Sequence, residues 1–280
     1  MITRPALKYN GGKWLLGPWI RSFFPEHETF VEGFGGGGSI TIQKERATRE
    51  FYFDIDSEVA NFMWVMSHRN SAKELIRRIY WTPYAREIHA WAVSETISTD
   101  PIDRALKFYC KCWMDRNYVR GKSFRLYGNM DSSGGHLPAS LWANVRHLYK
   151  IAERLRGITV ECKPYIQIAS SLDSLTTLHY LDPPYLGSVR GSGNLYTHEM
   201  KTEQEHIELL DLILSLKGMV IISGYPSDLY ASKLESQGWK MVTKGTRDNK
   251  RRERTEALWL NPLVQRRLAE KELGLFEVGV

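Results

Sequence analysis

Apolar residues recur along the chain with two different periods, and these periods predict where strands and helices lie. Short runs rich in β-branched and aromatic residues occupy 29–32 and 50–53, whereas apolar residues at helical spacing occupy 12–24. A further helix is expected after Ser57, whose hydroxyl can cap it. A glycine-rich turn and a short amphipathic helix separate the two strands. The first 56 residues therefore predict the opening βαβ unit of a doubly wound sheet.

The middle of the chain predicts helices rather than strands. Its clearest helical segments are 101–113 and 138–156. Strand-like runs return at 158–161, 178–181 and 218–222, with a helix near 203–216. We therefore expect an α/β fold whose sheet domain comprises residues 1–56 and 157–280, with a helical insert at 57–156.

The composition is that of a globular protein with a modest excess of positive charge. Of 280 residues, 42% are hydrophobic and 25% are charged, which supplies enough apolar surface for a packed core. No apolar run is long enough to span a membrane, and the first residues carry no signal-peptide core, so we expect a soluble, cytoplasmic protein without a membrane partner. The net charge of +6 favours an anionic partner such as nucleic acid, provided that the positive charge is clustered on one face.

The cysteines indicate neither a disulfide framework nor a metal site. Cys110, Cys112 and Cys162 are too few for a paired framework, and they lack the CxxC spacing with which cysteines bind zinc. We therefore expect no structural metal.

Two segments concentrate basic residues. The first interleaves basic and aromatic side chains between residues 114 and 136, and its cations are Arg116, Arg120, Lys122 and Arg125. The second is the run at 247–254, which includes Arg247, Lys250 and Arg251. Arginines of the first segment can reach phosphates or guanine edges. The second segment is interpreted equally well as a solvated loop or as a phosphate-contacting loop.

The glycine turn after the first strand is typical of a nucleoside-cofactor site. Gly33, Gly35 and Gly38 match the GxGxxG spacing, and Asp54 follows about twenty residues later, where dinucleotide-binding folds place a ribose-binding acid. Glycine lets the backbone approach a ligand closely, and the helix that follows presents free N–H groups. A tight turn with a purely structural purpose is the alternative.

A second motif stands directly after the apolar strand at 178–181. Asp182-Pro183-Pro184-Tyr185 falls at the carboxyl edge of the predicted sheet, where open α/β folds bind their ligands. Two prolines restrict the backbone, so the turn is expected to direct a carboxylate, a proline carbonyl and an aromatic ring together. Acceptors beside a stacking surface suit a planar base, although such a turn can also simply end a strand.

In these motifs the sequence resembles the Dam-like DNA adenine-N6 methyltransferases, a family with many phage-encoded members. The resemblance covers nearly the whole chain and rests on four ordered motifs. They are Lys8-Tyr9-Asn10-Gly11-Gly12-Lys13, Phe30-Val31-Glu32 with Phe34-Gly35-Gly36-Gly37-Gly38-Ser39, Asp54, and the Asp-Pro-Pro-Tyr turn. The family also has a target-recognition region between its cofactor-binding half and that turn, which is where the helical insert is predicted.

The resemblance implies a Rossmann-like methyltransferase sheet, S-adenosylmethionine as cofactor and adenine in double-stranded DNA as substrate. By similarity, Phe34 and the glycines contact the cofactor, Lys13 and Glu32 bind its methionine end, and Asp54 binds the ribose hydroxyls. The full implied cofactor set is Tyr9, Lys13, Glu32, Phe34, Gly35, Gly36, Gly38, Ser39 and Asp54. The basic residues of the two segments above are the implied DNA contacts.

The same resemblance assigns the transfer step to the Asp-Pro-Pro-Tyr turn. Asp182 and the carbonyl of Pro183 would accept both hydrogens of the adenine amino group, and Tyr185 would stack on the base after it is flipped out of the duplex. Pro184 completes the turn. The transfer is then direct and in line, without a metal or a covalent enzyme intermediate.

The sequence departs from the family pattern at two places. Some relatives carry an acidic residue near the adenine of the cofactor where this chain has Pro164. Tyr165 or backbone groups are expected to take over its contribution. The motif that often reads Glu-Pro-Phe is here Glu32-Gly33-Phe34.

Three other functions remain open at this stage. A DNA cytosine-N4 methyltransferase uses the same exocyclic-amine chemistry, a nicotinamide-dependent oxidoreductase fits the glycine turn, and a non-catalytic DNA-binding module fits the charge.

Overall fold

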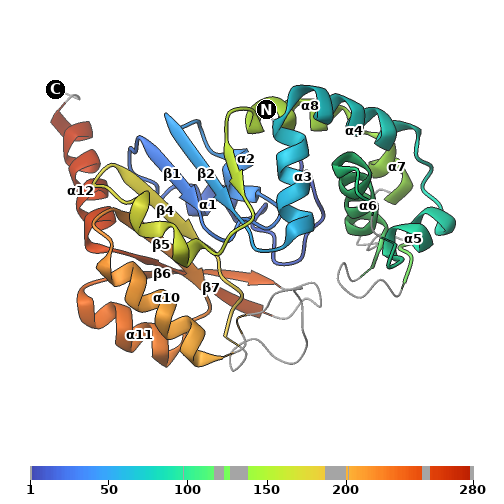
Figure 1. Ribbon diagram of the computed structural model, residues 1–280. Helices are drawn as coiled ribbons and strands as arrows, with labels where there is room; N and C mark the ends of the chain where they lie inside the picture. The colour runs from blue at the N-terminus through green and yellow to red at the C-terminus, as the bar shows by residue number, and fades with distance from the viewer. Residues whose placement is uncertain are drawn as a thin grey trace. The chain divides into compact units, whose positions relative to one another are not determined.

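The computed structural model describes residues 2–96, 98–116, 123–126, 138–186, 200, 202–247 and 253–277 (Figure 1). The chain divides into two compact units. The helical unit comprises Met1–Leu15, Gly36–Lys44 and Asp54–Cys162, and the sheet unit comprises Leu16–Gly35, Glu45–Phe53 and Lys163–Val280. The predicted insert at 57–156 falls within the helical unit, but the two-domain division made from the sequence stays a prediction. No described helix is both long and apolar enough to cross a membrane.

Six strands of the sheet belong to the sheet unit. They are β1 (Thr29–Glu32), β2 (Arg49–Phe53), β4 (Thr177–Leu181), β5 (Met219–Gly224), β6 (Lys240–Arg247) and β7 (Glu253–Leu260). Within this unit the strand order is β2-β1-β4-β5-β7-β6. Strands β2, β1, β4 and β5 run parallel, whereas β7 is antiparallel to both β5 and β6. The expected doubly wound α/β fold is thus confirmed.

The central strands are predictable from the sequence because they are buried. Strands β1, β4 and β5 are buried along their whole length, as parallel strands covered on both faces usually are. One hydrophobic core of this unit includes Val31, Leu181, Ile222 and Trp259 from the strands and Leu209 from a helix. Burial of apolar surface in this core is the main source of the unit's stability.

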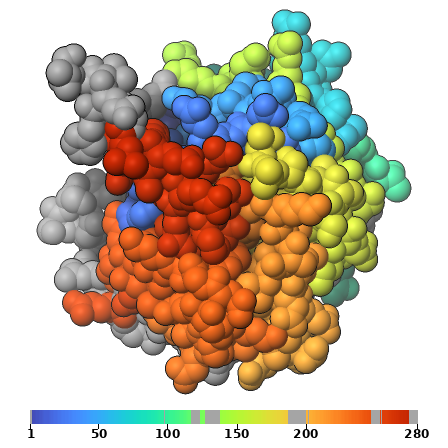
Figure 2. Space-filling model, turned by 90° about the vertical axis from the view of Figure 1, so that its left-hand side faces the viewer, coloured from blue at the N-terminus to red at the C-terminus, as the bar shows by residue number. Residues whose placement is uncertain are grey.

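The sheet unit also contains helices α1 (Gly17–Arg21), α10 (Glu203–Ser215), α11 (Asp228–Leu234) and α12 (Pro262–Glu277), with short 3-10 turns η1 (Tyr165–Gln167), η2 (Ala169–Ser171) and η3 (Glu235–Gln237). Of the α-helices, α10 and α11 contribute residues to this core. Helix α10 begins with a capping box formed by Thr202 and Glu205. Helix α12 packs against β5, and its outer side is exposed on the face shown in red in Figure 2.

The antiparallel hairpin of β6 and β7 is absent from the sequence prediction. The basic run at 247–254 was interpreted as a loop, yet Arg247 pairs with Glu253 and Thr246 with Arg254 in the ladder. The two ends of the run therefore lie in β6 and β7, and its residues 248–252 lie outside the described part of the chain. Charged residues along this edge conceal the period-two pattern that a half-exposed strand normally has.

The helical unit contains seven α-helices among its described residues. They are α2 (Ser39–Gln43), α3 (Ser57–Ser67), α4 (Arg69–Trp81), α5 (Arg86–Val93), α6 (Pro101–Met114), α7 (Pro138–Ala143) and α8 (Arg146–Leu155), followed by strand β3 (Thr159–Glu161). Helix α3 packs against α4, α6 and α8, and α5 packs against α6. The single helix predicted at 138–156 is two helices, since the helical conformation stops at Ala143 and resumes at Arg146.

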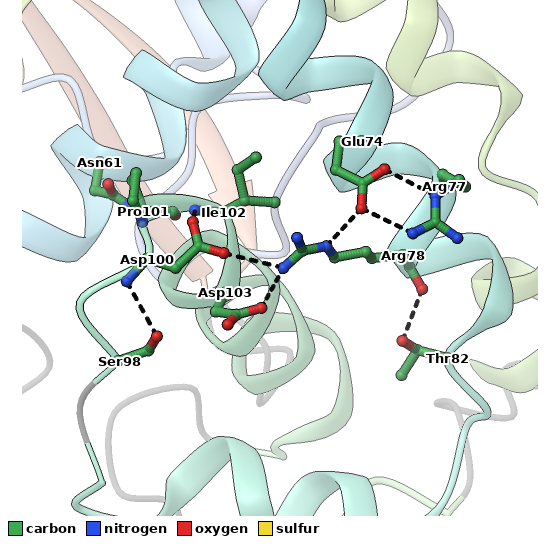
Figure 3. A network of polar contacts seen from close by, with 10 residues as sticks. All are labelled: Asn61, Glu74, Arg77, Arg78, Thr82, Ser98, Asp100, Pro101, Ile102 and Asp103. Atoms are coloured by element: carbon green, nitrogen blue, oxygen red, sulfur yellow. Dashed lines mark hydrogen bonds and ion pairs between the residues drawn. The ribbon is translucent and has the colours of Figure 1, made fainter.

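A network of charges connects α4 to the start of α6 (Figure 3). The guanidinium of Arg78 donates to Glu74 on its own helix and to Asp100 and Asp103 of the neighbouring segment. Asp100 also caps α6 by accepting a hydrogen bond from Ile102 N at 2.9 Å. These side chains are partly exposed, so each ion pair contributes at most about 1 kcal/mol.

The cap of α3 gives a prediction about stability. The sequence favoured Ser57 as the cap, but the carboxylate of Asp56 accepts from Glu58 N at 2.9 Å. We expect Asp56→Ala to lower the free energy of unfolding by about 0.5–2 kcal/mol, because a helix N–H loses its partner. Ser57→Ala is expected to change it by less than about 0.5 kcal/mol. Urea denaturation of the two variants measures both changes, and a larger loss in Ser57→Ala would contradict this assignment.

Candidate active site

The direction in which successive strands are added to the sheet reverses between β1 and β4. From β1 the chain continues to β2 on one side, whereas β4 pairs with β1 on the other side. Open α/β sheets bind ligands outside the carboxyl ends of the strands at such a reversal. Glu32 is in register with Tyr180, and Gly33 N donates to Tyr180 O at 3.1 Å. The glycine turn and the Asp-Pro-Pro-Tyr turn therefore start side by side.

Aromatic rings of the protein leave no space for a side chain at the first two glycines of the turn, Gly33 and Gly35. A Cβ on Gly33 would lie 2.6 Å from Cδ2 of Tyr165, and a Cβ on Gly35 would lie 2.0 Å from Cε2 of Tyr52. Both distances are far below van der Waals contact. Phe34, between these glycines, is half-buried, and its ring centroid lies 6.2 Å from that of Tyr165. The backbone thus follows a path that only glycine allows, which leaves Phe34 partly accessible.

The part of the turn that belongs to the helical unit contacts Tyr9 and Asp54. Gly36 and Gly38 have positive φ angles of 51° and 63°, which disfavour residues with a Cβ. A Cβ on Gly36 would lie 3.1 Å from Cε1 of Tyr9. Asp54 Oδ2 accepts from Gly36 N at 2.8 Å, and its Oδ1 accepts from Asp56 N at 2.8 Å. Asp54, expected as a ribose-binding acid, therefore also holds the turn.

The motif at residues 8–13 forms its own turn in the helical unit. Gly12 N donates to Tyr9 O at 3.3 Å, and Lys13 is buried with its Nζ donating to Gly11 O at 3.2 Å. Ser39, the first residue of α2, is buried as well. Burial and the nearby charge of Arg125 lower the pKa of Lys8 to about 8. The motif thus places two lysines, one of them with a lowered pKa, on a well-defined backbone.

The Asp-Pro-Pro-Tyr turn positions its aromatic ring through two contacts. Tyr185 Oη donates to Glu256 Oε2 at 2.8 Å, and its ring lies 4.6 Å from that of Tyr225, edge to face at 71°. Burial, the charge of Asp182 and the carboxylate of Glu256 raise the pKa of Tyr185 well above its ordinary value. The phenol is therefore a neutral donor. Asp182 itself is half-buried and Pro183 is buried.

Sequence reasoning missed Glu256 and Tyr225 as supports of this ring. Glu256 lies in β7, and the apolar run at 257–260 was the available signal for this strand. Tyr225 directly follows β5.

The expected DNA-contacting residues differ in how the structure places them. Arg116 is exposed, and its backbone N–H donates to Ser123 O at 2.9 Å. Arg125 is only 8% exposed, and its Nη2 donates to the backbone oxygen of Asp115 at 3.1 Å. Arg120, Lys122, Lys250 and Arg251, together with the side chain of Arg247, lie outside the described residues. A base-reading role for Arg125 stays a prediction, and its hydrogen bond connects residues 115 and 125.

Two buried histidines have partners that the sequence did not indicate. His89 Nε2 lies 2.9 Å from Asp115 Oδ2 in the helical unit, and the backbone of Asp115 pairs with that of Phe124. In the sheet unit, His206 Nδ1 lies 3.0 Å from Tyr230 Oη.

A cavity of about 540 Å³ lies elsewhere in the sheet unit. It is lined by residues that precede β1 and β4, such as Glu28 and Thr176, and by Lys271 of α12. Because it is at the amino ends of the strands, it is distinct from the two turns described above.

Comparison with known proteins identifies a matching family. The model of the D12 class N6 adenine-specific DNA methyltransferases matches residues 9–244, a span that contains both the glycine turn and the Asp-Pro-Pro-Tyr turn.

Individual relatives agree with this match. DNA adenine methylases of Salmonella typhi and Escherichia coli K12 are each 25% identical to the chain, over 235 and 237 residues, which is 81% of this chain and 82% of theirs. A DNA adenine methylase of Serratia marcescens is 25% identical over 187 residues, covering 65% of this chain and 67% of its own.

Proposed function

Because this chain belongs to the D12 class of N6 adenine-specific DNA methyltransferases, we propose that it takes its methyl group from S-adenosylmethionine and acts on double-stranded DNA. The enzyme transfers a methyl group to the N6 amino group of adenine in DNA. Cytosine-N4 methylation, nicotinamide-dependent oxidation and non-catalytic DNA binding are not favoured by these comparisons.

One observation carries the assignment of the site. The glycine turn after β1 and the Asp-Pro-Pro-Tyr turn after β4 begin on adjacent, paired strands. A donor-binding turn beside an amine-binding turn is the arrangement that direct transfer between two bound molecules requires.

The residues of the glycine turn fit the chemistry of the proposed methyl donor. Glu32 is a carboxylate at a buried strand end and suits the ammonium group of a methionine moiety. The half-buried ring of Phe34 suits the flat adenine moiety, and the carboxylate of Asp54 suits two ribose hydroxyls. Tyr9, Lys13, Gly35, Gly36, Gly38 and Ser39 complete the proposed set. When bound, S-adenosylmethionine supplies a methyl group that its sulfonium already activates.

The proposed task of the Asp-Pro-Pro-Tyr turn is to bind and orient the adenine amine. The Asp182 carboxylate and the Pro183 carbonyl accept the two amine hydrogens, which turns the nitrogen lone pair away from the purine ring. A carbon–nitrogen bond forms as the carbon–sulfur bond breaks, and N6 then loses one proton, for which Asp182 is the proposed acceptor. No metal takes part in this scheme.

Tyr185 is proposed as the surface on which the flipped base stacks. Such stacking contributes about 1–3 kcal/mol per base, which is similar to the few kcal/mol that unstacking costs. The hydrogen bond to Glu256 and the edge contact with Tyr225 fix the plane of the ring before a base arrives. Ordering the ring in advance reduces the entropy lost on binding.

The assignment is tested by incubating the enzyme with methyl-labelled S-adenosylmethionine and unmethylated DNA, in duplex and single-stranded form. Digestion to nucleosides is expected to place the label in N6-methyladenine, with faster incorporation in the duplex. Label in N4-methylcytosine would contradict the proposed transfer. Equal or faster incorporation in single strands would contradict the proposed substrate form only.

Asp54 gives a prediction that separates ligand binding from support of the turn. We expect Asp54→Ala to raise KM for S-adenosylmethionine about 10- to 100-fold, because hydrogen bonds to a charged group are lost. Asp56→Ala removes the neighbouring carboxylate, which caps α3, and serves as the matched control. Steady-state kinetics at saturating DNA measure both, and an equal rise of KM in the two variants would show that Asp54 acts only by holding backbone.

A further inference from the structure

A histidine lies fully buried in the middle of the central strand β4. His179 is 0% exposed and is the third residue of a strand otherwise built from apolar residues and threonine. Its Nδ1 lies 3.0 Å from Tyr165 Oη, and its Nε2 lies 3.5 Å from Asp173 Oδ1. An imidazole at such a position is costly unless both ring nitrogens have partners. The Nε2–Oδ1 contact is too poorly aligned to be a hydrogen bond, so the three side chains form a series of one hydrogen bond and one electrostatic contact through the interior of the sheet unit.

Asp173 is the fixed end of this chain. Its Oδ2 accepts from Lys217 N and its Oδ1 accepts from Gly218 N, each at 2.8 Å. Gly218 makes the approach possible, because a Cβ at that position would lie 2.8 Å from the same Oδ1. Burial alone raises the pKa of Asp173, but the nearby imidazole of His179 and hydrogen bonds from the two backbone amides lower it below its ordinary value. Asp173 is thus an anion held in place by backbone.

The charge of Asp173 sets the direction of the hydrogen bonds. A carboxylate favours the His179 tautomer that carries its proton on Nε2, which leaves Nδ1 as the acceptor for Tyr165. Burial and the charge of Asp173 raise the pKa of Tyr165, so its hydroxyl stays protonated and donates. Tyr165 then donates to Nδ1 of His179, and the protonated Nε2 of His179 faces the carboxylate of Asp173.

The other end of the chain is the ring of Tyr165. This side chain is 2% exposed and fills the space over Gly33, where a Cβ would be only 2.6 Å from the ring. Its centroid lies 6.2 Å from that of Phe34. The phenol oxygen is anchored by His179, and the ring edge is in contact with the glycine turn. A shift of the ring must therefore move the backbone of Gly33 and the side chain of Phe34.

We propose that Asp173, His179 and Tyr165 form a positioning chain that holds the Gly33–Phe34 turn and thereby sets the affinity for S-adenosylmethionine. The inference rests on the proposed function, in which Phe34 contacts that molecule. None of the three residues is a catalytic residue, because each acts through the turn. The expected signature is a change in affinity for the methyl donor with little change in kcat.

The chain itself offers a matched control for the loss of a tyrosine hydroxyl. Tyr230 Oη lies 3.0 Å from His206 Nδ1, so a second buried tyrosine–histidine hydrogen bond of the same length exists in the same unit. The ring of Tyr230 packs 4.9 Å from that of Trp259, not against the glycine turn. Tyr230→Phe therefore breaks an equivalent bond without touching Phe34.

The experiment compares Tyr165→Phe and Tyr230→Phe by isothermal titration with S-adenosylmethionine in the absence of DNA. We expect Kd to rise about 3- to 10-fold in Tyr165→Phe and by less than about 2-fold in Tyr230→Phe, with a similar fall of Tm in both. His179→Asn keeps an acceptor near the position of Nδ1 and is expected to restore most of the affinity that His179→Leu loses. In kinetic assays the loss in Tyr165→Phe appears in KM for the donor, while kcat and DNA affinity stay close to wild type.

An unchanged Kd in Tyr165→Phe, or an equal rise in the two phenylalanine variants, would overturn the positioning role. If either tyrosine variant does not fold, the same comparison is made between His179→Asn and His179→Leu, and equal affinities would overturn it. Absence of binding by the wild-type enzyme would instead contradict S-adenosylmethionine as the donor, so the two failures are distinguishable.

Discussion

Asp182→Ala is expected to lower kcat for methyl transfer by about 10²- to 10⁴-fold. The proposed transition state needs an acceptor for the amine hydrogens, and mutations that remove one such positioned group commonly have effects of this size. The carboxylate directly follows the buried strand β4, so its removal does not disturb the ladder. Single-turnover assays with labelled S-adenosylmethionine measure the rate of the transfer step itself.

Binding measurements separate this effect from a general loss of structure. We expect the Asp182→Ala enzyme to bind DNA and S-adenosylmethionine with affinities close to those of wild type, because most of the proposed contacts with both come from other residues. Asp228→Ala removes an exposed acid from the first turn of α11 in the same unit and is the matched control, with unchanged kcat. Turnover within 10-fold of wild type would remove Asp182 from the mechanism.

Gly35→Ala is expected to have the largest effect on the fold of the site. The new methyl group would be 2.0 Å from the ring of Tyr52, which is fully buried and cannot move aside. Overpacking of this kind costs about 1–3 kcal/mol or more, and relief by a shift of the turn would displace Phe34. We therefore expect both a lower Tm and the loss of detectable methylation.

Gly245 provides a control, because a glycine-to-alanine substitution at this position causes no clash. Gly245→Ala in β6 introduces a methyl group with no atom within 4 Å, so stability and activity are expected to stay near wild type. Combining Gly35→Ala with Tyr52→Leu should destabilise less than the sum of the single changes, because the ring atoms responsible for the clash are gone. Thermal unfolding of the four variants measures the coupling, and strict additivity would refute the steric explanation.

The central strands were predictable because their chemistry is local. Strand β1 begins and ends at the predicted residues, and β4 begins one residue earlier than predicted. Each is a short run rich in aliphatic and aromatic residues, followed by Gly33 in β1 and by Asp182 and two prolines in β4, which is typical of a strand buried on both faces. The residues that carry the proposed chemistry directly follow these strands, so their common edge could also be inferred.

The remaining features depend on contacts between distant parts of the chain. Nothing near Gly35 in sequence indicates that Tyr52 lies against it, and nothing near Tyr185 indicates Glu256. The hairpin β6–β7 was missed because exposed cations interrupt its alternation. Asp56 rather than Ser57 caps α3, a one-residue difference that propensity does not resolve because both residue types are good caps.

The backbone amides that donate to Asp173 are at the amino end of β5. They are one strand length from the Asp-Pro-Pro-Tyr turn, which is roughly 17 Å for five residues. Any side chain at position 218 would clash with the Asp173 carboxylate and thereby disturb its contact with the imidazole of His179. A genetic screen for weakened methylation should therefore recover substitutions at Gly218, a site that a ranking of residues by distance from the chemistry would discard.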